Sequence, residues 1–324
     1  MCAQYHCPEG LLRIARHIFS MACTLAGALN KLGYTIKHEQ FFDTVCVQAI
    51  PGITSEMIEK IALRRGINLW YPCANCVLIS TDEVTTLKEI NEIVAIFAEA
   101  AGKKAEEVTS LCDCFCIDEK FQRKSAFLEE HNFNSYHSET DLMRYIKMLE
   151  RKDFSLANGM IPLGSCTMKL NSAVSMFAMS WPEFGNIHPF VPADQAEGYH
   201  KMMEELGEAL KEITGFDAVS FQPNSGAAGE YSGLMVIRQY HISRNEGYRN
   251  VALIPSSAHG TNPASAAMAG MKVVVVECDE NGNISVEDLR KKAVEHRENL
   301  SAAMITYPST HGLFDEAITE MIKI

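Results

Sequence analysis

No stretch of this 324-residue chain approaches the roughly 20 consecutive apolar residues that a membrane-spanning helix requires. Residues 1–6 lack the basic start and the apolar core of a secretory signal. The chain also has no excess of basic residues, because 29 Lys and Arg stand against 41 Asp and Glu and give a net charge of −12. An acidic chain binds polyanions poorly. The composition therefore predicts neither a membrane partner nor a nucleic-acid partner.

The cysteines do not suit a disulfide framework. There are 11 of them, an odd number, scattered through a chain without a secretory signal, which favours reduced thiols in a cytosol-like compartment. Cys73 and Cys76 have the two-residue spacing of a zinc knuckle. Cys112, Cys114 and Cys116 are separated by single residues, which is atypical of structural zinc. We therefore expect ordinary thiols and no bound metal.

Hydrophobic spacing predicts two domains joined by a linker. Residues 1–109 are expected to form a small α+β domain in which helices and strand pairs alternate. Residues 110–137 are polar and irregular and are expected to be the linker. Residues 138–324 are expected to form an α/β domain with a parallel sheet, because Val- and Ile-rich strands alternate with helices there.

The element boundaries follow from periodicity and from capping signals. Strands are expected at 34–38, 44–49, 68–71 and 77–80 in the first domain, and at 218–221, 250–254, 272–276 and 302–307 in the second. A capping-box pattern at 80–83 predicts the start of a helix that runs to about residue 100. Ser138 is expected to cap a helix over 139–150.

Residues 221–228 carry the strongest local signal for a binding site. A short apolar run, 218–221, leads into Pro223, Asn224 and Gly226, and helical spacing follows directly. A strand, a small-residue turn and a helix in this order leave free backbone N–H groups at the helix start, which suit an anion such as phosphate. An ordinary turn between a strand and a helix is the alternative, because a single small-residue turn is a weak motif.

Three loops are expected at the carboxyl ends of the parallel strands, where ligands of such sheets bind: residues 222–227, 255–263 and 307–312. The second loop places His259 among hydroxyl and amide side chains, and the third contains further hydroxyls. Together the loops could supply a phosphate cradle, a flat ring that stacks on a heteroaromatic ligand, and hydroxyls that hold it. This combination favours a phosphorylated planar cofactor, although a hydrogen-bonded loop histidine is the alternative for His259.

Five motifs follow one another in the second half of the chain. They are MIPLGSCTMKLN at 160–171, NIHPF at 186–190, QPNSGA at 222–227, SAHGTNPASA at 257–266 and ITYPST at 305–310. In this order they closely resemble the C-terminal half of the glycine cleavage system P-protein family. Residues 5–109 resemble the end of the family's N-terminal half more weakly, through residues 10–11 and 41–44. The resemblance covers almost the whole chain.

The resemblance implies a fold, a cofactor and a reaction. The fold is the large α/β domain of the aminotransferase-like, pyridoxal phosphate-dependent transferases, here incomplete and preceded by a small α+β domain. The cofactor is pyridoxal phosphate. Glycine loses its carboxylate as CO2, and the aminomethyl group passes to the lipoyl arm of the H-protein. A homodimer, or a pairing of the two halves of the full protein, is also implied.

The resemblance implies two groups of site residues. The cofactor-binding group is Ser225, Gly226 and Ala227 at the phosphate, His259 stacked on the pyridine ring, and Thr306 near the ring face or its phenolic oxygen. The catalytic group lines the entrance for glycine and the lipoyl arm and consists of Ser165, Cys166, Thr167 and His188.

The resemblance also places two essential groups after the position that matches Ile324. They are the Asp that pairs with the pyridine nitrogen and the Lys that forms the Schiff base. The sequence ends inside a helical pattern, 315–324, that has no cap. We therefore expect a fragment that is inactive alone, with Lys169 as a loop contact only.

Two other hypotheses compete with that of a glycine decarboxylase fragment. One is a different pyridoxal phosphate enzyme of the same fold, such as a cysteine desulfurase or an amino acid decarboxylase, against which the loop at 164–171 argues. The other is a non-catalytic, truncated subunit that binds a partner. A bacterial cytoplasmic location is expected, with the mitochondrial matrix as the alternative.

Overall fold

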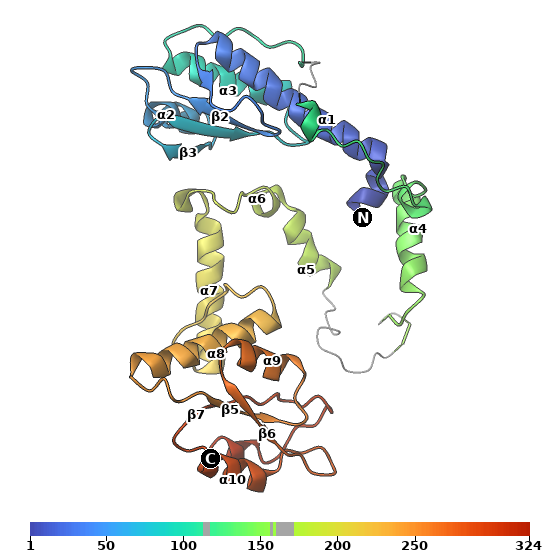
Figure 1. Cartoon of the computed structure of the whole chain (residues 1–324), viewed down its shortest axis with the longest axis vertical. Coiled ribbons are helices and arrows are strands. Elements are labelled where there is room, and N and C mark those ends of the chain that lie inside the picture. The colour runs from blue at the N-terminus through green and yellow to red at the C-terminus, as the bar shows by residue number, and fades with distance from the viewer. Residues whose placement is uncertain (113–116, 156–157, 160–171) are drawn as a thin grey trace. The chain divides into compact units, whose positions relative to one another are not determined.

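The computed structural model describes residues 1–112, 117–155, 158–159 and 172–324 (Figure 1). The chain divides into two compact units, Met1–Ser155 and Leu156–Ile324, each with hydrophobic clusters of its own. Among the described residues, no helix combines the length and the apolar character that crossing a bilayer demands.

The first unit is built on a four-stranded antiparallel sheet with the strand order β1-β2-β4-β3. Its strands are β1 (Thr35–Ile36), β2 (Thr44–Gln48), β3 (Trp70–Cys73) and β4 (Cys76–Ser80). Its helices are α1 (Cys2–Lys31), α2 (Ser55–Arg64), α3 (Leu87–Ala100) and α4 (Glu139–Glu150), with short 3-10 turns at Glu119–Phe121 and His131–Phe133.

The core of this unit lies between one face of the sheet and the helices. Alternate residues of the two central strands are fully buried, namely Val45, Val47, Val77 and Ile79. Leu25 and Leu29 of α1 and Ile90 and Phe97 of α3 belong to the same cluster. The hydroxyl of Tyr34 donates to the carbonyl of Phe97 at 2.8 Å inside this core, and burial raises the pKa of Tyr34 to about 12.

The third helix begins later than the capping box predicted at 80–83. Ser80 remains in β4, opposite Thr44 of β2, and the two hydroxyls lie 2.8 Å apart. The capping box is instead formed by Thr86 and Glu89, which bond each other's backbone N–H groups. Strand pairing therefore holds Ser80 and prevents it from capping the helix. The predicted cap at Ser138 is confirmed, since its hydroxyl accepts from Asp141.

The second unit contains a three-stranded parallel sheet with the order β6-β5-β7. Its strands are β5 (Val251–Pro255), β6 (Lys272–Val276) and β7 (Leu300–Ala303). Its helices are α5 (Ala173–Phe177), α6 (Pro182–Gly185), α7 (Glu197–Thr214), α8 (Gly226–Ser243), α9 (Thr261–Met268), α10 (Val286–Glu295) and α11 (Ile318–Met321), with 3-10 turns at Ala178–Ser180 and Ala193–Gln195. Mixed α/β structure is therefore confirmed.

Helices cover both faces of this sheet. Every residue of β5 is buried, and its side chains alternate between two clusters. One cluster joins Ala252 and Ile254 to Leu234 of α8 and Ala266 of α9. The other joins Val251 and Leu253 to Leu289 of α10 and Met321 of α11. Figure 1 shows α8 and α9 on one side of β5 and α10 on the other.

The prediction of a strand at 218–221 is wrong. These residues form no strand, and all of them are exposed. The three described strands of the sheet pair with one another, and none of them pairs with 218–221. An apolar run becomes a strand only where another strand satisfies its backbone groups. The helical pattern at 315–324 likewise yields only the four-residue α11.

Leu25 tests the core of the first unit. Leu25→Ala removes a side chain that is 0% exposed, and we expect the free energy of unfolding to fall by about 2–5 kcal/mol through lost burial and a residual cavity. Urea unfolding of the full chain measures it. Leu12→Ala in the same helix is the control, because Leu12 is 43% exposed and should cost less than about 0.5 kcal/mol. Equal losses in the two variants would contradict this core.

Candidate functional site

Two of the three predicted loops meet at one edge of the parallel sheet. Residues 256–260 follow β5 and residues 304–312 follow β7, and the two strands run parallel, so both loops leave the sheet at its carboxyl edge. The hydroxyl of Thr310 donates to the carbonyl of Ser257 at 2.5 Å. This bond ties the loops together.

The first of the predicted loops, 222–227, ends at the start of α8. Ser225 is the N-cap residue in extended conformation, and its hydroxyl accepts from Ala228 N–H at 3.1 Å. The N–H of Gly229 donates to the carbonyl of Ser225. Within the described residues, the N–H groups of Gly226 and Ala227 have no protein acceptor. These two donors are exposed at the positive end of an 18-residue helix.

Glu230 connects the first turns of α8 and α9. Its carboxylate accepts from the side-chain amide of Asn262 at 3.0 Å and from the hydroxyl of Ser265 at 3.3 Å. Asn262 and Ser265 are 5% and 4% exposed, and both bonds to the half-buried Glu230 are partly shielded from solvent. The amide oxygen of Asn262 is buried without a hydrogen-bond partner in the described structure. Through Glu230, the start of α8 is joined to the loop that carries His259.

Sequence reasoning missed Glu230. Its partners belong to the motif at 257–266, but the link between positions 230 and 262 is not local and has no spacing signal. The only sequence hint is an acidic residue five positions after Ser225 in a helix that is otherwise apolar and small there.

His259 lies just before α9 with an exposed side chain. Its Nδ1 accepts from Thr261 N–H at 3.2 Å, and its carbonyl accepts from Asn262 N–H at 2.9 Å. With Nδ1 as the acceptor, the neutral ring carries its proton on Nε2. The helix start thus fixes the orientation of the imidazole, while the faces of the ring remain accessible.

The remaining predicted site residues make few hydrogen bonds, or lie outside the described residues. Thr306 is exposed in the loop after β7, the loop that the Thr310 bond ties to 256–260. His188 accepts at Nδ1 from Phe190 N–H at 3.0 Å, and no hydrogen bond among the described residues joins it to the three loops. Ser165, Cys166, Thr167 and Lys169 lie outside the described residues.

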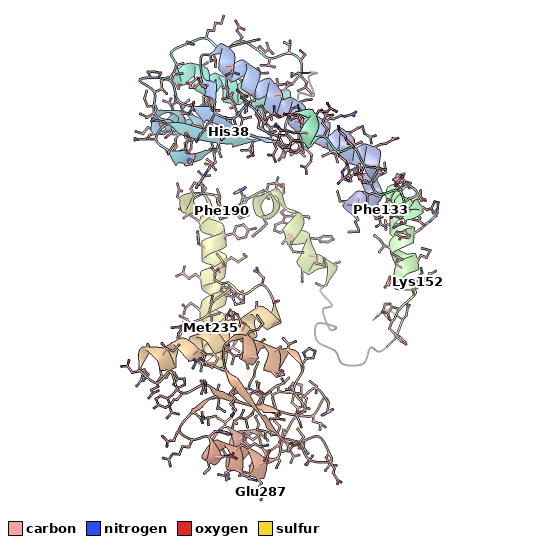
Figure 2. The ribbon with its side chains drawn as sticks, viewed as in Figure 1. His38, Phe133, Lys152, Phe190, Met235 and Glu287 are labelled. Atoms are coloured by element: carbon pink, nitrogen blue, oxygen red, sulfur yellow. The ribbon has the colours of Figure 1, made fainter. Side chains whose placement is uncertain are left out.

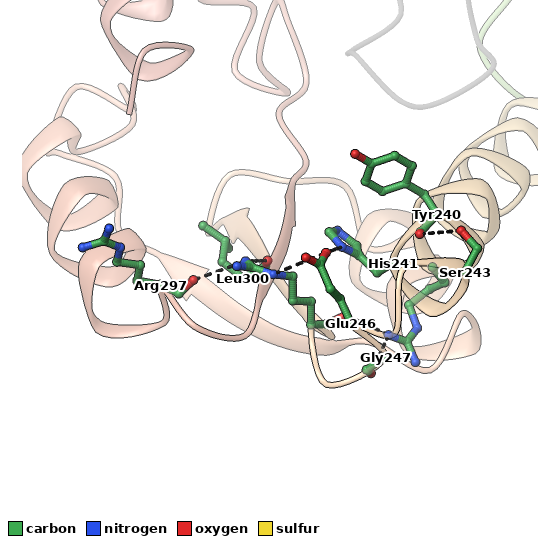
Figure 3. A network of polar contacts seen from close by, with 9 residues as sticks. Tyr240, His241, Ser243, Glu246, Gly247, Arg297 and Leu300 are labelled. Atoms are coloured by element: carbon green, nitrogen blue, oxygen red, sulfur yellow. Dashed lines mark hydrogen bonds and ion pairs between the residues drawn. The ribbon is translucent and has the colours of Figure 1, made fainter.

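A polar network fixes the far end of α8 (Figure 3). The guanidinium of Arg238 donates to the carbonyls of Gly247 and Arg249. His241 contacts the Glu246 carboxylate at 3.1 Å. Arg249 donates to the carbonyls of Arg297 and Leu300 and lies 3.8 Å from Glu246. The network joins α8 to the segments that enter β5 and β7, so α8 is held at both ends.

No group of three or more His, Cys, Asp or Glu side chains in the described ranges is arranged to hold a metal ion. Cys73, Cys76 and Cys112 form no disulfide within those ranges, while Cys114 and Cys116 fall outside them.

Comparison with known proteins identifies close relatives. The family model for the glycine cleavage system P-protein matches residues 1–97. Glycine dehydrogenase (decarboxylating) of Flavobacterium johnsoniae is 54% identical over 324 residues, which are 100% of this chain and 34% of that protein. Proteins of the same name from Christiangramia forsetii and Vibrio cholerae are 53% and 51% identical, over 100% and 99% of this chain and 34% of each relative. The chain thus spans about a third of the length of these relatives.

A solved structure, mouse CSAD in its apo form, matches 40% of this chain and 31% of its own, with 22% sequence identity and a TM-score of 0.34. A likeness this low supports no statement about the fold or the site.

Glu230→Ala tests the link between α8 and α9. We expect the free energy of unfolding to fall by about 1–3 kcal/mol, because Asn262 and Ser265 then bury donors without an acceptor. Faster amide hydrogen exchange in residues 261–268 would locate the loss. Glu230→Gln keeps one acceptor oxygen and should lose less.

Glu287→Ala is the matched control for that substitution. Glu287 lies exposed on α10, and the described structure gives it no hydrogen bond or ion pair (Figure 2). If Glu230→Ala and Glu287→Ala change the free energy of unfolding and the amide exchange of residues 261–268 by the same amount, Glu230 does not hold α8 and α9 together.

Proposed function

The chain belongs to the glycine cleavage system P-protein family, and we propose that it forms the cofactor-binding part of a pyridoxal phosphate-dependent glycine decarboxylase. The observation that carries this proposal is the pair of free N–H groups at the start of α8, tied through Glu230 to the loop of His259. In the proposed reaction glycine loses CO2, and the aminomethyl group passes to the lipoyl arm of an H-protein.

The start of α8 fits a phosphate group. Gly226 and Ala227 offer two N–H donors, and Ser225 adds a hydroxyl. A side chain at Gly226 would meet no atom within 4 Å, so the backbone is open to a ligand. Free N–H groups and the helix dipole both favour an anion at this position. Ser225, Gly226 and Ala227 would therefore hold the phosphate.

His259 and Thr306 would contact the ring of the cofactor. The bond from Thr261 N–H fixes the imidazole and leaves its faces free for stacking. Thr306 would add a hydroxyl from the loop after β7. When bound, pyridoxal phosphate supplies the electron sink for loss of the glycine carboxylate, and the protein groups orient and tune it.

The entrance for glycine and the lipoyl arm would be lined by Ser165, Cys166, Thr167 and His188. This assignment rests on the motifs at 160–171 and 186–190. We further propose a homodimer or a pairing of the two halves in the full-length relatives. A cytoplasmic location is proposed because the relatives compared above are bacterial.

We also propose that this chain alone releases no CO2 from glycine. The relatives are about three times as long. The resemblance of the motifs implies that the cofactor-binding lysine lies after the position that matches Ile324. One His-Lys pair does occur in the chain, His200-Lys201, but it lies on α7. Lys201 is 76% exposed there and faces Glu205 at 3.9 Å. That position suits a solvated helix surface and not a cofactor site.

Gly226→Pro tests the phosphate site. Proline is well accepted at the first helical position, and Ser225 already has the extended backbone that precedes a proline, so the helix should persist. The substitution removes one N–H donor. We expect the dissociation constant for pyridoxal phosphate, followed by phosphorus NMR, to rise about tenfold.

Gly226→Ala is the control, since it keeps the N–H donor and adds a methyl group that contacts no protein atom. Pyridoxal without its phosphate should bind weakly and equally to both variants. If Gly226→Pro binds pyridoxal phosphate as tightly as the unaltered chain, the phosphate does not sit on these N–H groups.

Borohydride reduction in the presence of pyridoxal phosphate, followed by peptide mapping, tests the proposed inactivity. We expect no specifically labelled lysine and no CO2 from carboxyl-labelled glycine. Specific labelling of Lys169 or Lys201 together with CO2 release would show that this chain carries its own catalytic lysine.

A further inference from the structure

Cys73 and Cys76 face each other across a tight β-hairpin. Cys73 ends β3, Cys76 begins β4, and the two are directly paired across the two-residue turn 74–75. Because Val77 points into the core, its neighbour Cys76 points to the opposite face of the sheet, and the paired Cys73 shares that face.

The turn between the two cysteines is fixed from outside the hairpin. The carbonyl of Ala74 accepts from Ser55 N–H, and the carbonyl of Asn75 accepts from Ala49 N–H, both at 2.9 Å. These bonds link the turn to the start of α2 and to the end of β2. The backbone positions of Cys73 and Cys76 are therefore set by the fold.

Directly paired residues of antiparallel strands have Cα atoms about 4.5–5.5 Å apart. A disulfide requires about 4.4–6.8 Å between the same atoms. The hairpin can therefore accept a Cys73–Cys76 bond without a large movement of its backbone.

The two thiols are chemically unequal. A hydrogen bond from the Cys76 thiol lowers the pKa of Cys73, with smaller contributions from Asn75 N–H and from the charge of Lys37. The same contact, together with burial, raises the pKa of Cys76 to about 11. Cys73 is exposed, whereas Cys76 is half-buried. The greater exposure of Cys73 and the direction of its pKa shift would make it the nucleophile of the pair, with Cys76 reacting second.

The described residues around the pair do not complete a zinc site. Structural zinc takes four ligands, and within the described part of the chain no third His, Cys, Asp or Glu completes a cluster with these two thiols.

We propose that Cys73 and Cys76 form a reversible thiol–disulfide site that reacts with low-molecular-weight disulfides. The Cys73 thiolate attacks one sulfur of the reagent, the reagent's S–S bond breaks, and one thiolate leaves. Cys76 then gives up its proton and attacks the Cys73 sulfur of the mixed disulfide. The Cys73–Cys76 bond forms and the second thiolate leaves. Two protein thiols are oxidised, and one disulfide is reduced to two thiols.

The test is equilibration of the full chain with reduced and oxidised glutathione at graded ratios, followed by acid quenching and tryptic mapping. Trypsin releases residues 66–88, which contain Cys73 and Cys76 and no other cysteine. We expect this peptide to lose two hydrogen atoms and to carry no glutathione. The native chain should need about tenfold less oxidised glutathione for this than the chain in urea, because the fold holds the thiols together.

Three serine variants separate the roles of the thiols. Cys76→Ser should trap glutathione on Cys73, with about tenfold more mixed disulfide than the unaltered chain at the same ratio. Cys73→Ser should leave Cys76 largely unmodified. Cys2→Ser, which removes another exposed thiol, should change nothing in residues 66–88.

The proposal fails if the peptide keeps both hydrogen atoms at every ratio in the native chain. It also fails if the unaltered chain accumulates as much mixed disulfide as Cys76→Ser, or if oxidation occurs as readily in urea.

Discussion

The second unit depends on the burial of β5 on both of its faces. All five residues of this central strand are buried, two of them against α8 and α9 and two against α10 and α11. Parallel pairing with β6 and β7 then sends the segments after β5 and β7 to the same edge of the sheet. The candidate site lies at that edge because the parallel direction of the strands, and not the sequence of the loops, decides at which edge the loops leave the sheet.

Helix α8 brings the remaining part of the site to that edge, and its position is set at both ends. Near its start, Glu230 binds Asn262 and Ser265 of α9. Near its end, Arg238 and the Arg249–Glu246 contacts join it to the segments that enter β5 and β7 (Figure 3). The free N–H groups at Gly226 and Ala227 keep a fixed position relative to the loop of His259 because α8 is held at both ends.

The sequence predicted elements best where local signals agree. The helix 139–150 and the strand 272–276 match the structure to the residue. Ser138 caps the helix, and the valine-rich strand pairs along its whole length with β5. The apolar run at 218–221 failed because a strand needs a neighbour that no local pattern supplies. Turn and loop chemistry predicts Ser225, Gly226 and His259 as site residues, whereas it gives no signal for the Glu230 contacts because the partners of Glu230 lie 32 and 35 positions away.

Non-local contacts also distinguish Cys73 and Cys76 from an isolated CxxC sequence, because residues outside the hairpin hold the turn between them. Ordering a residue costs about 1–2 kcal/mol of backbone entropy, and a hydrogen bond returns about 0.5–1.5 kcal/mol. The two bonds that hold Ala74 and Asn75 therefore offset much of the cost of ordering a two-residue turn. In both proposed sites a short motif provides the side chains and N–H groups, and hydrogen bonds to distant segments hold them in position. A motif alone therefore cannot distinguish a working site from a flexible loop with the same residues.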